Sequence, residues 1–395
     1  MTVASREQAA RLERRRRVRR RTRRRRIVAL VLVLLLTPVV YSYVTTMVKP
    51  SSLPLSIRTI EWIRANHGAW LVDTVEHYWY SWNTPSPGGP ALKKLPTVGV
   101  AEKPPMKKRT VTVAYMPPRI APLIHPAFQL EGVWRATGQL VGGRPPVLVT
   151  TFRPDVDYPR VVAYVAWIDH TRTQLALYPG RYEPPGASPR GPMEVPTGER
   201  WRLLATFNSG FTYGDGHGGF GVDGQTATPL QAGDAAVVEY RDGRVDVNTW
   251  HGGTKLPPWL VLARQNLPLL VDNGRPSPQL TDPHAFWGYT LGNAVRVWRS
   301  GVGIDRHGNL IYAAADLQTA AALAQLFVHA GAVRAMELDI NPEWPSFITY
   351  SSPGGHDAIK LVPNSQQSAE RYLVPDDRDF FAVYRRSGSA LVPFR

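Results

Sequence analysis

Apolar and polar positions in the last third of the chain follow a strand–helix–strand pattern. Leu310–Ala315 is an apolar run, and the Ala-rich segment from about Asp316 to Ala330 has the composition of a helix. Asp316 is a suitable N-cap for that helix. Val333–Ile340 predicts a second strand, so the three segments form a βαβ unit. In open α/β sheets ligands bind at the carboxyl ends of such strands, where this chain places Asp339.

Between residues 127 and 395, short apolar runs alternate with turns rich in Gly, Pro and Asp. Val237–Tyr240 and Val245–Asn248 flank the turn Arg241–Arg244, which predicts a hairpin. The whole pattern predicts one sheet-dominated domain of the α+β (mixed α/β) class at residues 127–395. Further strands are expected at Val147–Phe152, Val161–Asp169, Thr173–Tyr178, Leu203–Phe207 and Ala235–Tyr240.

The first 48 residues differ from the rest in charge and hydropathy. Residues 1–26 contain thirteen Arg and two Glu, which account for +11 of the formal charge of +16. Residues 27–48 are uncharged and long enough to cross a bilayer. The Arg flank predicts a single-pass anchor in the cytoplasmic membrane, N-terminus inside and C-terminal domain outside. A cleavable signal peptide is the alternative, although Tyr41–Met47 offers no small-x-small cleavage site.

The Arg tail fits two kinds of partner. A basic run beside a membrane span favours contact with anionic lipid headgroups, so residues 1–48 are assigned to membrane lipid. Nucleic acid is the other class, but the run lacks the interleaved aromatic side chains on which bases stack, and we predict no nucleic-acid partner. The chain has no cysteine, which excludes disulfides, zinc–thiolate sites and a cysteine nucleophile.

Two segments join the anchor to the domain. Residues 49–82 carry large apolar side chains at helical spacing and predict juxtamembrane amphipathic helices with a break near His67–Gly68. Their aromatic side chains would face either the membrane interface or the main domain, and packing on the domain is the favoured expectation. Residues 83–126 are rich in Pro and predict a linker that contains a short strand at Thr110–Tyr115.

Several segments resemble, in order, the motifs of the phosphodiester glycosidase family. Phe207–Phe211 is similar to the family's Asn-Gly-Gly-Phe-Phe motif, and Arg299–Asp305 is similar to its Arg-Thr-Ala-Val-Gly motif. Glu337–Asp339 resembles the start of its Leu-Asp-Gly-Gly-Gly-Ser-Ser motif. The resemblance implies removal of a sugar from a phosphodiester. Other matching segments are Arg153–Pro159, Ile168–Asp169, Leu177–Gly180, Leu267–Gly274 and Asp316.

The chain departs from the family directly after Asp339. Ile340–Ser346 replaces the Gly-Gly-Gly-Ser-Ser segment and contains two prolines and a Trp. Glycines let a backbone approach a ligand closely, whereas proline removes an N–H donor. The replacement therefore argues against a phosphate cradle of backbone amides here, and it predicts either a different substrate or a loss of catalysis.

Glu337 and Asp339 are the candidate catalytic carboxylates. If Val333–Ile340 is a strand throughout, both side chains lie on one face, about 6.5–7 Å apart. Such a pair would act as general acid and base in glycoside cleavage. It would equally hold a hard divalent cation. No other cofactor is indicated.

The remaining candidates come from the two other motifs. Arg299 is the third catalytic candidate, because a guanidinium binds phosphate with planar donors. Asn208 offers an amide to sugar hydroxyls or phosphate oxygens. The resemblance extends the substrate-binding set to Gly210 and Ser300. His217, at the tip of the Gly-rich loop, is a candidate acid or base.

Three functions fit these features. The first is a membrane-anchored extracytoplasmic hydrolase that cleaves a sugar from a glycosyl phosphodiester of a bacterial cell-envelope glycan or glycolipid. The second is a non-catalytic glycan-binding or envelope-assembly protein that has lost the Gly-rich segment. The third, a structural membrane protein, accounts for the N-terminal region only.

Overall fold

The computed structural model describes residues 3–83, 85–89, 92–100, 115–186, 191–213, 218–281, 287–288, 296–363 and 367–386. The chain divides into two compact units. Residues 1–50 and 55–72 form the first, and residues 51–54 and 73–395 form the second. The expected strand at Thr110–Tyr115 lies, but for its last residue, outside the described part of the chain.

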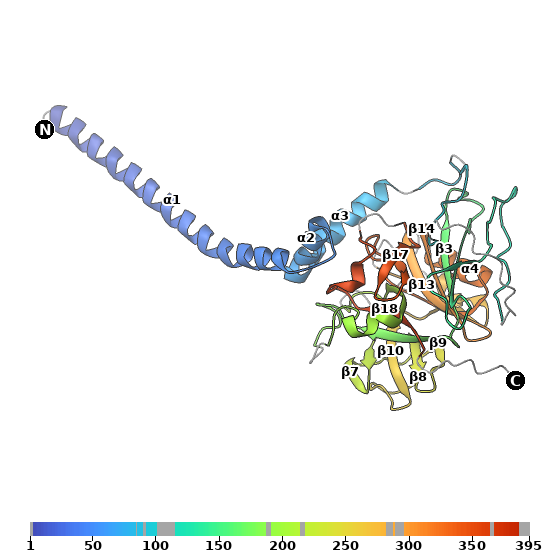
Figure 1. Ribbon diagram of the computed structural model, residues 1–395. Helices are drawn as coiled ribbons and strands as arrows, with labels where there is room; N and C mark the ends of the chain where they lie inside the picture. The colour runs from blue at the N-terminus through green and yellow to red at the C-terminus, as the bar shows by residue number, and fades with distance from the viewer. Residues whose placement is uncertain are drawn as a thin grey trace. The chain divides into compact units, whose positions relative to one another are not determined.

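The N-terminal region is helical (Figure 1). Its elements are α1 (Val3–Val48), α2 (Leu55–Ile63), the π-helical turn η1 (Arg64–Gly68) and α3 (Ala69–Trp82). Residues 19–48 of α1 are long and apolar enough to cross a membrane, which is consistent with a single-pass anchor or a signal sequence. The predicted break is confirmed, because His67 has the positive φ of 66° that interrupts a helix.

The large side chains of α3 do not follow the expectation. Val72 is buried and Tyr80 packs against a core cluster, but the other large apolar residues of the helix are exposed. The prediction that these aromatic residues pack on the domain is therefore wrong for most of them. The exposed residues are Trp70, Leu71, Val75, Tyr78, Trp79 and Trp82.

The second unit contains three antiparallel sheets in its described part. The eight-stranded sheet has the order β1-β2-β3-β14-β13-β15-β11-β12. Its strands are β1 (Arg135–Thr137), β2 (Val147–Phe152), β3 (Ala163–Ile168), β14 (Leu310–Gln318), β13 (Val297–Asp305), β15 (Ala332–Glu337), β11 (Leu269–Asp272) and β12 (Arg275–Pro276).

The two smaller sheets have five strands each. One runs β7 (Gln225–Thr228), β6 (Phe220–Val222), β10 (Leu260–Asn266), β8 (Ala235–Tyr240), β9 (Val245–Thr249). The other runs β17 (His356–Lys360), β16 (Phe347–Ser352), β5 (Leu203–Asn208), β18 (Phe380–Arg385), β4 (Thr173–Tyr178). Short 3₁₀ turns occur at η2 (Thr197–Arg202), η3 (Pro278–Thr281) and η5 (Arg371–Leu373). The predicted sheet-dominated mixed fold and the β8–β9 hairpin are both confirmed.

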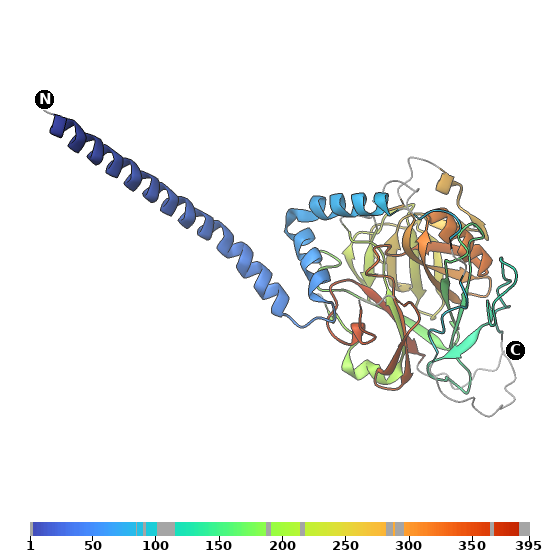
Figure 2. The same cartoon turned by 90° about the horizontal axis from the view of Figure 1, so that it is seen from above.

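The βαβ unit is present, with one strand inserted. β14 and β15 both pair antiparallel with β13, which lies between them, so they run parallel to each other. Helix α4 (Ala320–His329) connects them. It packs against one face of the eight-stranded sheet, as Figures 1 and 2 show from two directions.

Both ends of the predicted unit need correction. β14 continues to Gln318, paired with Val297, so the helix begins later and Thr319 rather than Asp316 is its N-cap. The Thr319 side chain accepts a hydrogen bond from the Ala322 N–H at 3.1 Å. β15 ends at Glu337 instead of Ile340. The Leu338 N–H still donates to the Ser300 carbonyl of β13, but the Asp339 N–H donates outside the sheet, to the Ser209 carbonyl.

Close packing of β13 against α4 and against β15 explains two of its glycines. A Cβ on Gly301 would lie 2.7 Å from the ring of Phe327 in α4, and one on Gly303 would lie 2.7 Å from the Arg334 carbonyl. Interiors are packed as densely as organic crystals, so no side chain fits there. Packing thus requires both glycines of the Ser-Gly-Val-Gly sequence, whatever the chemistry of the neighbouring residues.

We expect Thr319→Ala to lower the free energy of unfolding by about 1 kcal/mol, because the first turn of α4 loses its only side-chain cap. Thermal unfolding of the full chain in detergent, followed by circular dichroism, measures the effect. Thr319→Ser keeps the hydroxyl and is the control. Equal destabilisation by Ala and Ser would show that the cap does not contribute.

Candidate functional site

Three segments meet where β5, β13 and β15 come together. The Asn208 amide at the end of β5 donates to the Ser300 hydroxyl at 3.0 Å. Ser300 in turn donates to the Asp339 carbonyl at 2.7 Å. The amide N–H of Asp339 donates to the carbonyl of Ser209 at 3.0 Å. This last bond goes to a residue outside the eight-stranded sheet, and it explains why β15 ends before Asp339.

The Asn208 carbonyl oxygen is also fully used. It accepts from the Tyr312 hydroxyl at 2.9 Å and from the Ser346 backbone N–H at 3.0 Å. Both ends of a buried amide are thereby satisfied, which fixes its orientation. Asn208 thus joins strands from two different sheets, and its side chain holds the site together in this structure.

The Asp339 carboxylate faces an arginine that the sequence had not indicated. One oxygen accepts from the Asn341 N–H at 3.0 Å, and the other lies 3.6 Å from a guanidinium nitrogen of Arg378. Asp339 is only 5% exposed.

Arg299 and Glu337 form a separate pair on the α4 side of the sheet. Arg299 Nη1 lies 2.6 Å from Glu337 Oε1, and both side chains are fully buried. The guanidinium also donates to the carbonyls of Gln318 and Trp287, at 3.0 and 2.9 Å. Each candidate carboxylate therefore has its own arginine, and the two do not share one strand as expected.

Burial shifts the titration of Glu337. Desolvation is the main cause that raises the pKa of this carboxyl, and the charge of Asp339 also raises it. Arg299 lowers the pKa, and the net value is about 7. A carboxyl with a pKa near neutrality is suited to proton transfer at pH 7, because both protonation states are populated.

The Arg299–Glu337 pair is incompletely satisfied. Arg299 Nη2 and Glu337 Oε2 are buried and have no hydrogen-bond partner among the described residues. The same holds for Trp287 Nε1 and Gln318 Oε1, which belong to the two residues whose carbonyls contact Arg299. Buried polar groups of this kind cost free energy unless something binds them. Two donors and two acceptors thus gather around the buried ion pair.

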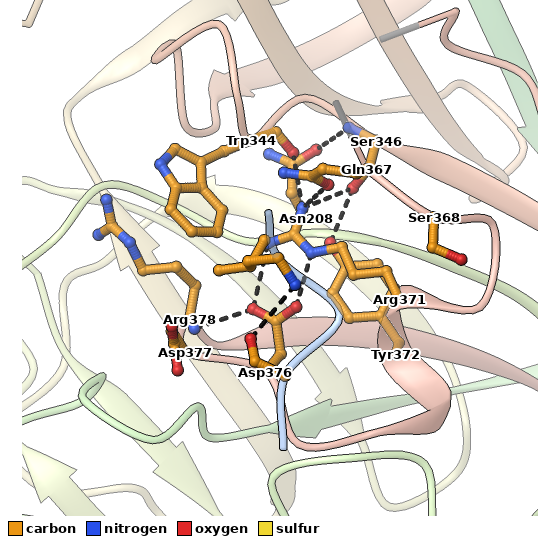
Figure 3. A network of polar contacts seen from close by, with 12 residues as sticks. Asn208, Trp344, Ser346, Gln367, Ser368, Arg371, Tyr372, Asp376, Asp377 and Arg378 are labelled. Carbon is orange, nitrogen blue, oxygen red and sulfur yellow. Dashed lines mark hydrogen bonds and ion pairs between the residues drawn. The ribbon is translucent and has the colours of Figure 1, made fainter. Parts of the chain in front are cut away.

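A run of charged residues before β18 surrounds the other side of the site (Figure 3). Asp376 pairs with Arg371 at 2.6 Å. Arg378 faces Asp339. Asp379 pairs with Arg264 at 2.6 Å, and Asp377 with Arg181 at 2.8 Å. The sequence signal that would have found them is four consecutive charged residues directly before an apolar strand, since such residues are rarely buried without partners.

Arg264 accounts for Gly210. Its guanidinium donates to the Phe211 carbonyl at 2.9 Å and lies over the Tyr213 ring, 4.4 Å from the centroid. A Cβ on Gly210 would come within 3.3 Å of that guanidinium. Gly210 therefore makes room for a buried arginine of this protein, a packing role that is sufficient to explain it.

Glu183 is a further carboxyl of this region that sequence analysis missed. It is partly buried and accepts weakly from the Tyr213 N–H, at 3.3 Å. Desolvation raises its pKa to about 7; Arg378 and Arg264 oppose the shift, and Asp379 favours it. Its sequence context, Glu-Pro-Pro in a loop, gave no sign of a site.

The segment that replaces the family glycines is closed on itself. The Asn341 N–H donates to the Asp339 carboxylate, and the N–H groups of Glu343 and Trp344 both donate to Asn341. The Ser346 N–H donates to the Asn208 side chain. Pro342 and Pro345 have no N–H to donate. Trp344 is buried, and the guanidinium carbons of Arg371 and Arg378 both lie 4.7 Å from its ring centroid. The expectation that this segment offers no amide cradle agrees with these contacts.

The structure thus joins Asn208, Ser300 and Asp339 in one network and Arg299 and Glu337 in a second. His217 lies outside the described residues. Within the described part of the chain, no group of three or more His, Asp or Glu side chains is arranged to hold a metal ion. The possible divalent cation therefore has no ligand set among those residues.

We expect the stability difference between the wild type and Glu337→Gln to depend on pH. The folded pKa of about 7 exceeds the unfolded value, so this group stabilises the fold fully below the unfolded pKa and loses its contribution as pH rises through about 7. The wild type should therefore exceed the variant in melting temperature by more at about pH 5 than at about pH 8. Other titrating groups are common to both proteins and cancel. A difference that grows with pH would contradict the assignment.

Residues 204–339 match the model of a family described as phosphodiester glycosidase. The resemblance expected from the sequence is confirmed over this segment. No curated protein matches the sequence.

Solved structures are similar at low identity. One is the catalytic domain of zebrafish N-acetylglucosamine-1-phosphodiester alpha-N-acetylglucosaminidase, auto-inhibited by its pro-peptide, with 15% identity and a TM-score of 0.40 over 64% of this chain and 87% of that one. A Synechocystis protein has 13% identity and a TM-score of 0.34, over 62% and 63%. An exported protein from Burkholderia pseudomallei has 13% identity and a TM-score of 0.33, over 62% and 76%.

Proposed function

We propose that this domain, which carries a segment of the phosphodiester glycosidase type at residues 204–339, hydrolyses glycosyl phosphodiesters. One observation carries the proposal. The matched segment contains Asn208, Arg299, Ser300, Glu337 and Asp339, and hydrogen bonds or ion pairs link these residues into two adjoining networks. Motif residues that are distant in sequence and meet in space are the usual mark of a site.

The reaction would break the bond between the anomeric carbon of a sugar and a phosphate oxygen. Water attacks the carbon, the phosphate departs with the electron pair, and a carboxylate takes a proton from the water. Glu337, with a pKa of about 7, is the proposed proton acceptor, and Asp339 supplies negative charge beside the developing oxocarbenium ion. Arg299 Nη2, which has no hydrogen-bond partner in the described part of the chain, is the proposed donor to a phosphate oxygen.

Helix α1 gives the proposal a location. We propose that residues 27–48 anchor the chain in the cytoplasmic membrane of a bacterium, with the Arg tail inside and the domain outside. Substrates at that surface would be sugars linked through phosphodiesters in envelope glycans or glycolipids.

A second function, glycan binding without turnover, is favoured by one specific observation. Trp344 and its neighbours fill the segment where the family has glycines, and every N–H from Asn341 to Ser346 is bonded within the protein. A site closed in this way would hold a sugar yet lack amide donors for the leaving phosphate.

We expect the full chain in detergent to release free sugar from one or more members of a panel of sugar-1-phosphodiesters, tested with and without divalent cations. Asp339→Asn should lower the rate by about a hundredfold or more, the size of effect typical for the loss of one group that stabilises charge in the transition state. Asp242→Asn, at an exposed hairpin turn, is the matched control and should leave the rate unchanged.

The outcomes separate the two functions. Release by the wild type and the control, but not by Asp339→Asn, supports the hydrolase. Binding of the same compounds without release, by a chain whose melting curve shows it folded, supports the binding protein. The absence of both binding and release would count against both functions.

A further inference from the structure

A cleft lies away from the candidate site, between the edge of a five-stranded sheet and the eight-stranded sheet. Its volume is about 610 Å³. It is lined by residues of β9 and of β11, by the loop between β9 and β10, and by Arg334 of β15. Arg334 and Glu337 are three residues apart on β15 and point to opposite faces of the strand, roughly 10 Å apart along it. The cleft is therefore a separate place on the domain.

The rim of the cleft carries an exposed aromatic ring. Trp259 is 62% exposed, although large aromatic side chains are usually buried. Trp250 forms part of the wall; it is buried, its Nε1 donates to the Gly253 carbonyl at 3.0 Å, and its ring packs against Gly252. One aromatic ring is thus fixed in the wall while the other is open to solvent. The apolar C–H face of a pyranose ring fits an open aromatic face of this kind.

The polar groups of the cleft are held in place. Arg334 donates to the Val247 carbonyl at 2.7 Å and forms an ion pair with Asp246. Asp246 also accepts from the Val247 N–H at 2.8 Å and from the Asn248 amide at 3.4 Å. The Asn248 amide can both donate and accept, which suits a ligand that carries hydroxyls.

The charges of the lining are balanced. The cations Arg334 and Lys255 are matched by the carboxylates Asp246 and Asp272. A site for phosphate or for an acidic sugar would require an excess of positive charge. The balance favours an uncharged ligand that is rich in hydroxyl groups.

We propose that this cleft is a non-catalytic binding site for pyranose units of a neutral glycan. Trp259 stacks on one sugar ring, and Asn248 with the Asp246–Arg334 pair binds its hydroxyls. The site goes beyond the proposed hydrolysis and stands whether or not the domain turns over a phosphodiester. It would hold a glycan chain on the domain at a distance from the candidate site.

Calorimetric titration of the full chain in detergent tests the proposal with short neutral oligosaccharides of hexose and N-acetylhexosamine, acidic oligosaccharides and inorganic phosphate. We expect binding of a neutral oligosaccharide, and a dissociation constant about tenfold weaker in Trp259→Ala, the equivalent of one lost aromatic contact. Trp201→Ala removes a ring of similar exposure, 57%, outside the cleft and should change nothing.

Three results would overturn the proposal: no binding of any neutral oligosaccharide, equal affinity in Trp259→Ala and the wild type, or a preference for phosphate or acidic sugars. Turnover of sugar-1-phosphodiesters is measured on the same variants. Because Trp259 lies outside the candidate site, hydrolysis should persist in Trp259→Ala, so failure of the cleft proposal and failure of the hydrolase proposal are distinguishable.

A second, independent observation concerns α3. Leu71, Val75, Tyr78, Trp79 and Trp82 recur at helical spacing, and all five are exposed, Trp82 at 81%. Residues at these intervals share one face of a helix. The face is apolar, rich in aromatic rings and without a protein partner in the described part of the chain.

We infer that this face lies in the membrane interface. Trp and Tyr concentrate at the headgroup level, where an apolar ring with a polar atom is favoured. The candidate span ends at Val48 and α3 begins at Ala69, and most of the residues between them are helical in α2 and η1. Trp62, near the end of α2, donates to the Ser42 hydroxyl of α1 at 3.1 Å, so the chain enters α3 from a point beside the end of the candidate span. The inference rests on α1 being embedded in a membrane.

The absence of cysteine makes the test direct, because one introduced thiol carries one environment-sensitive fluorophore. Full chains labelled at Trp79→Cys, His77→Cys or Leu34→Cys are reconstituted in liposomes that contain lipids with quenchers at known depths. We expect quenchers in the bilayer core to quench the Leu34 label in α1, and quenchers at the headgroup level to quench the Trp79 label. The His77 label should hardly be quenched by either.

Two results would overturn the inference. Equal exposure of the Trp79 and His77 labels to water, with the Leu34 label in the bilayer, would leave the anchor intact and α3 outside the membrane. Shielding of the Trp79 label that depends on protein concentration rather than on lipid would make a second copy of the chain the partner. A Leu34 label in water would instead contradict the anchor.

Discussion

The alternation of side chains along β13 is the constraint on which the rest of the site depends. Arg299 and Ser300 are neighbours in sequence, and the pleat of the strand sends them to opposite faces of the eight-stranded sheet. Arg299 meets Glu337 beneath α4, while Ser300 meets Asn208 and the Asp339 carbonyl on the other face. One dipeptide thus serves two networks, and a register slip of one residue would exchange them.

The glycines that follow keep this arrangement in place. α4 rests directly on Gly301, the strand partner of Glu337, so the helix packs on the face of the sheet that carries the fully buried Arg299–Glu337 pair. That burial raises the pKa of Glu337 and leaves polar atoms of both residues without partners. Packing and electrostatics here have the same cause, which is the short distance between helix and sheet.

Buried ion pairs form the other side of the site at a cost in desolvation. Arg371–Asp376 and Arg264–Asp379 are nearly inaccessible to solvent, and such pairs rarely stabilise a fold more than apolar side chains of equal size would. Removal of one partner, however, leaves a buried charge. We therefore interpret these pairs as fixing the position of Arg378, and with it Trp344, rather than as a source of stability.

The sequence by itself determined the elements that rest on local patterns. The strands β2, β3, β4, β5, β8 and β9, the βαβ unit, the helix break at His67 and the apolar span all follow from periodicity, turn residues and length, whereas the short strands β6 and β7 were not predicted. The motif order also indicated Asn208, Ser300 and Asp339, which the structure brings together.

Only the tertiary structure decided which partners these residues have. Asn208 meets Tyr312 across 104 positions, and Arg264 meets Asp379 across 115. Such contacts depend on the order of strands in the sheets, which no local pattern encodes. The same holds for the end of β15, because the bond between Asp339 and Ser209 ends the strand where the apolar pattern continues to Ile340. Side-chain pattern fixes what a segment prefers, and long-range hydrogen bonding decides where that preference stops.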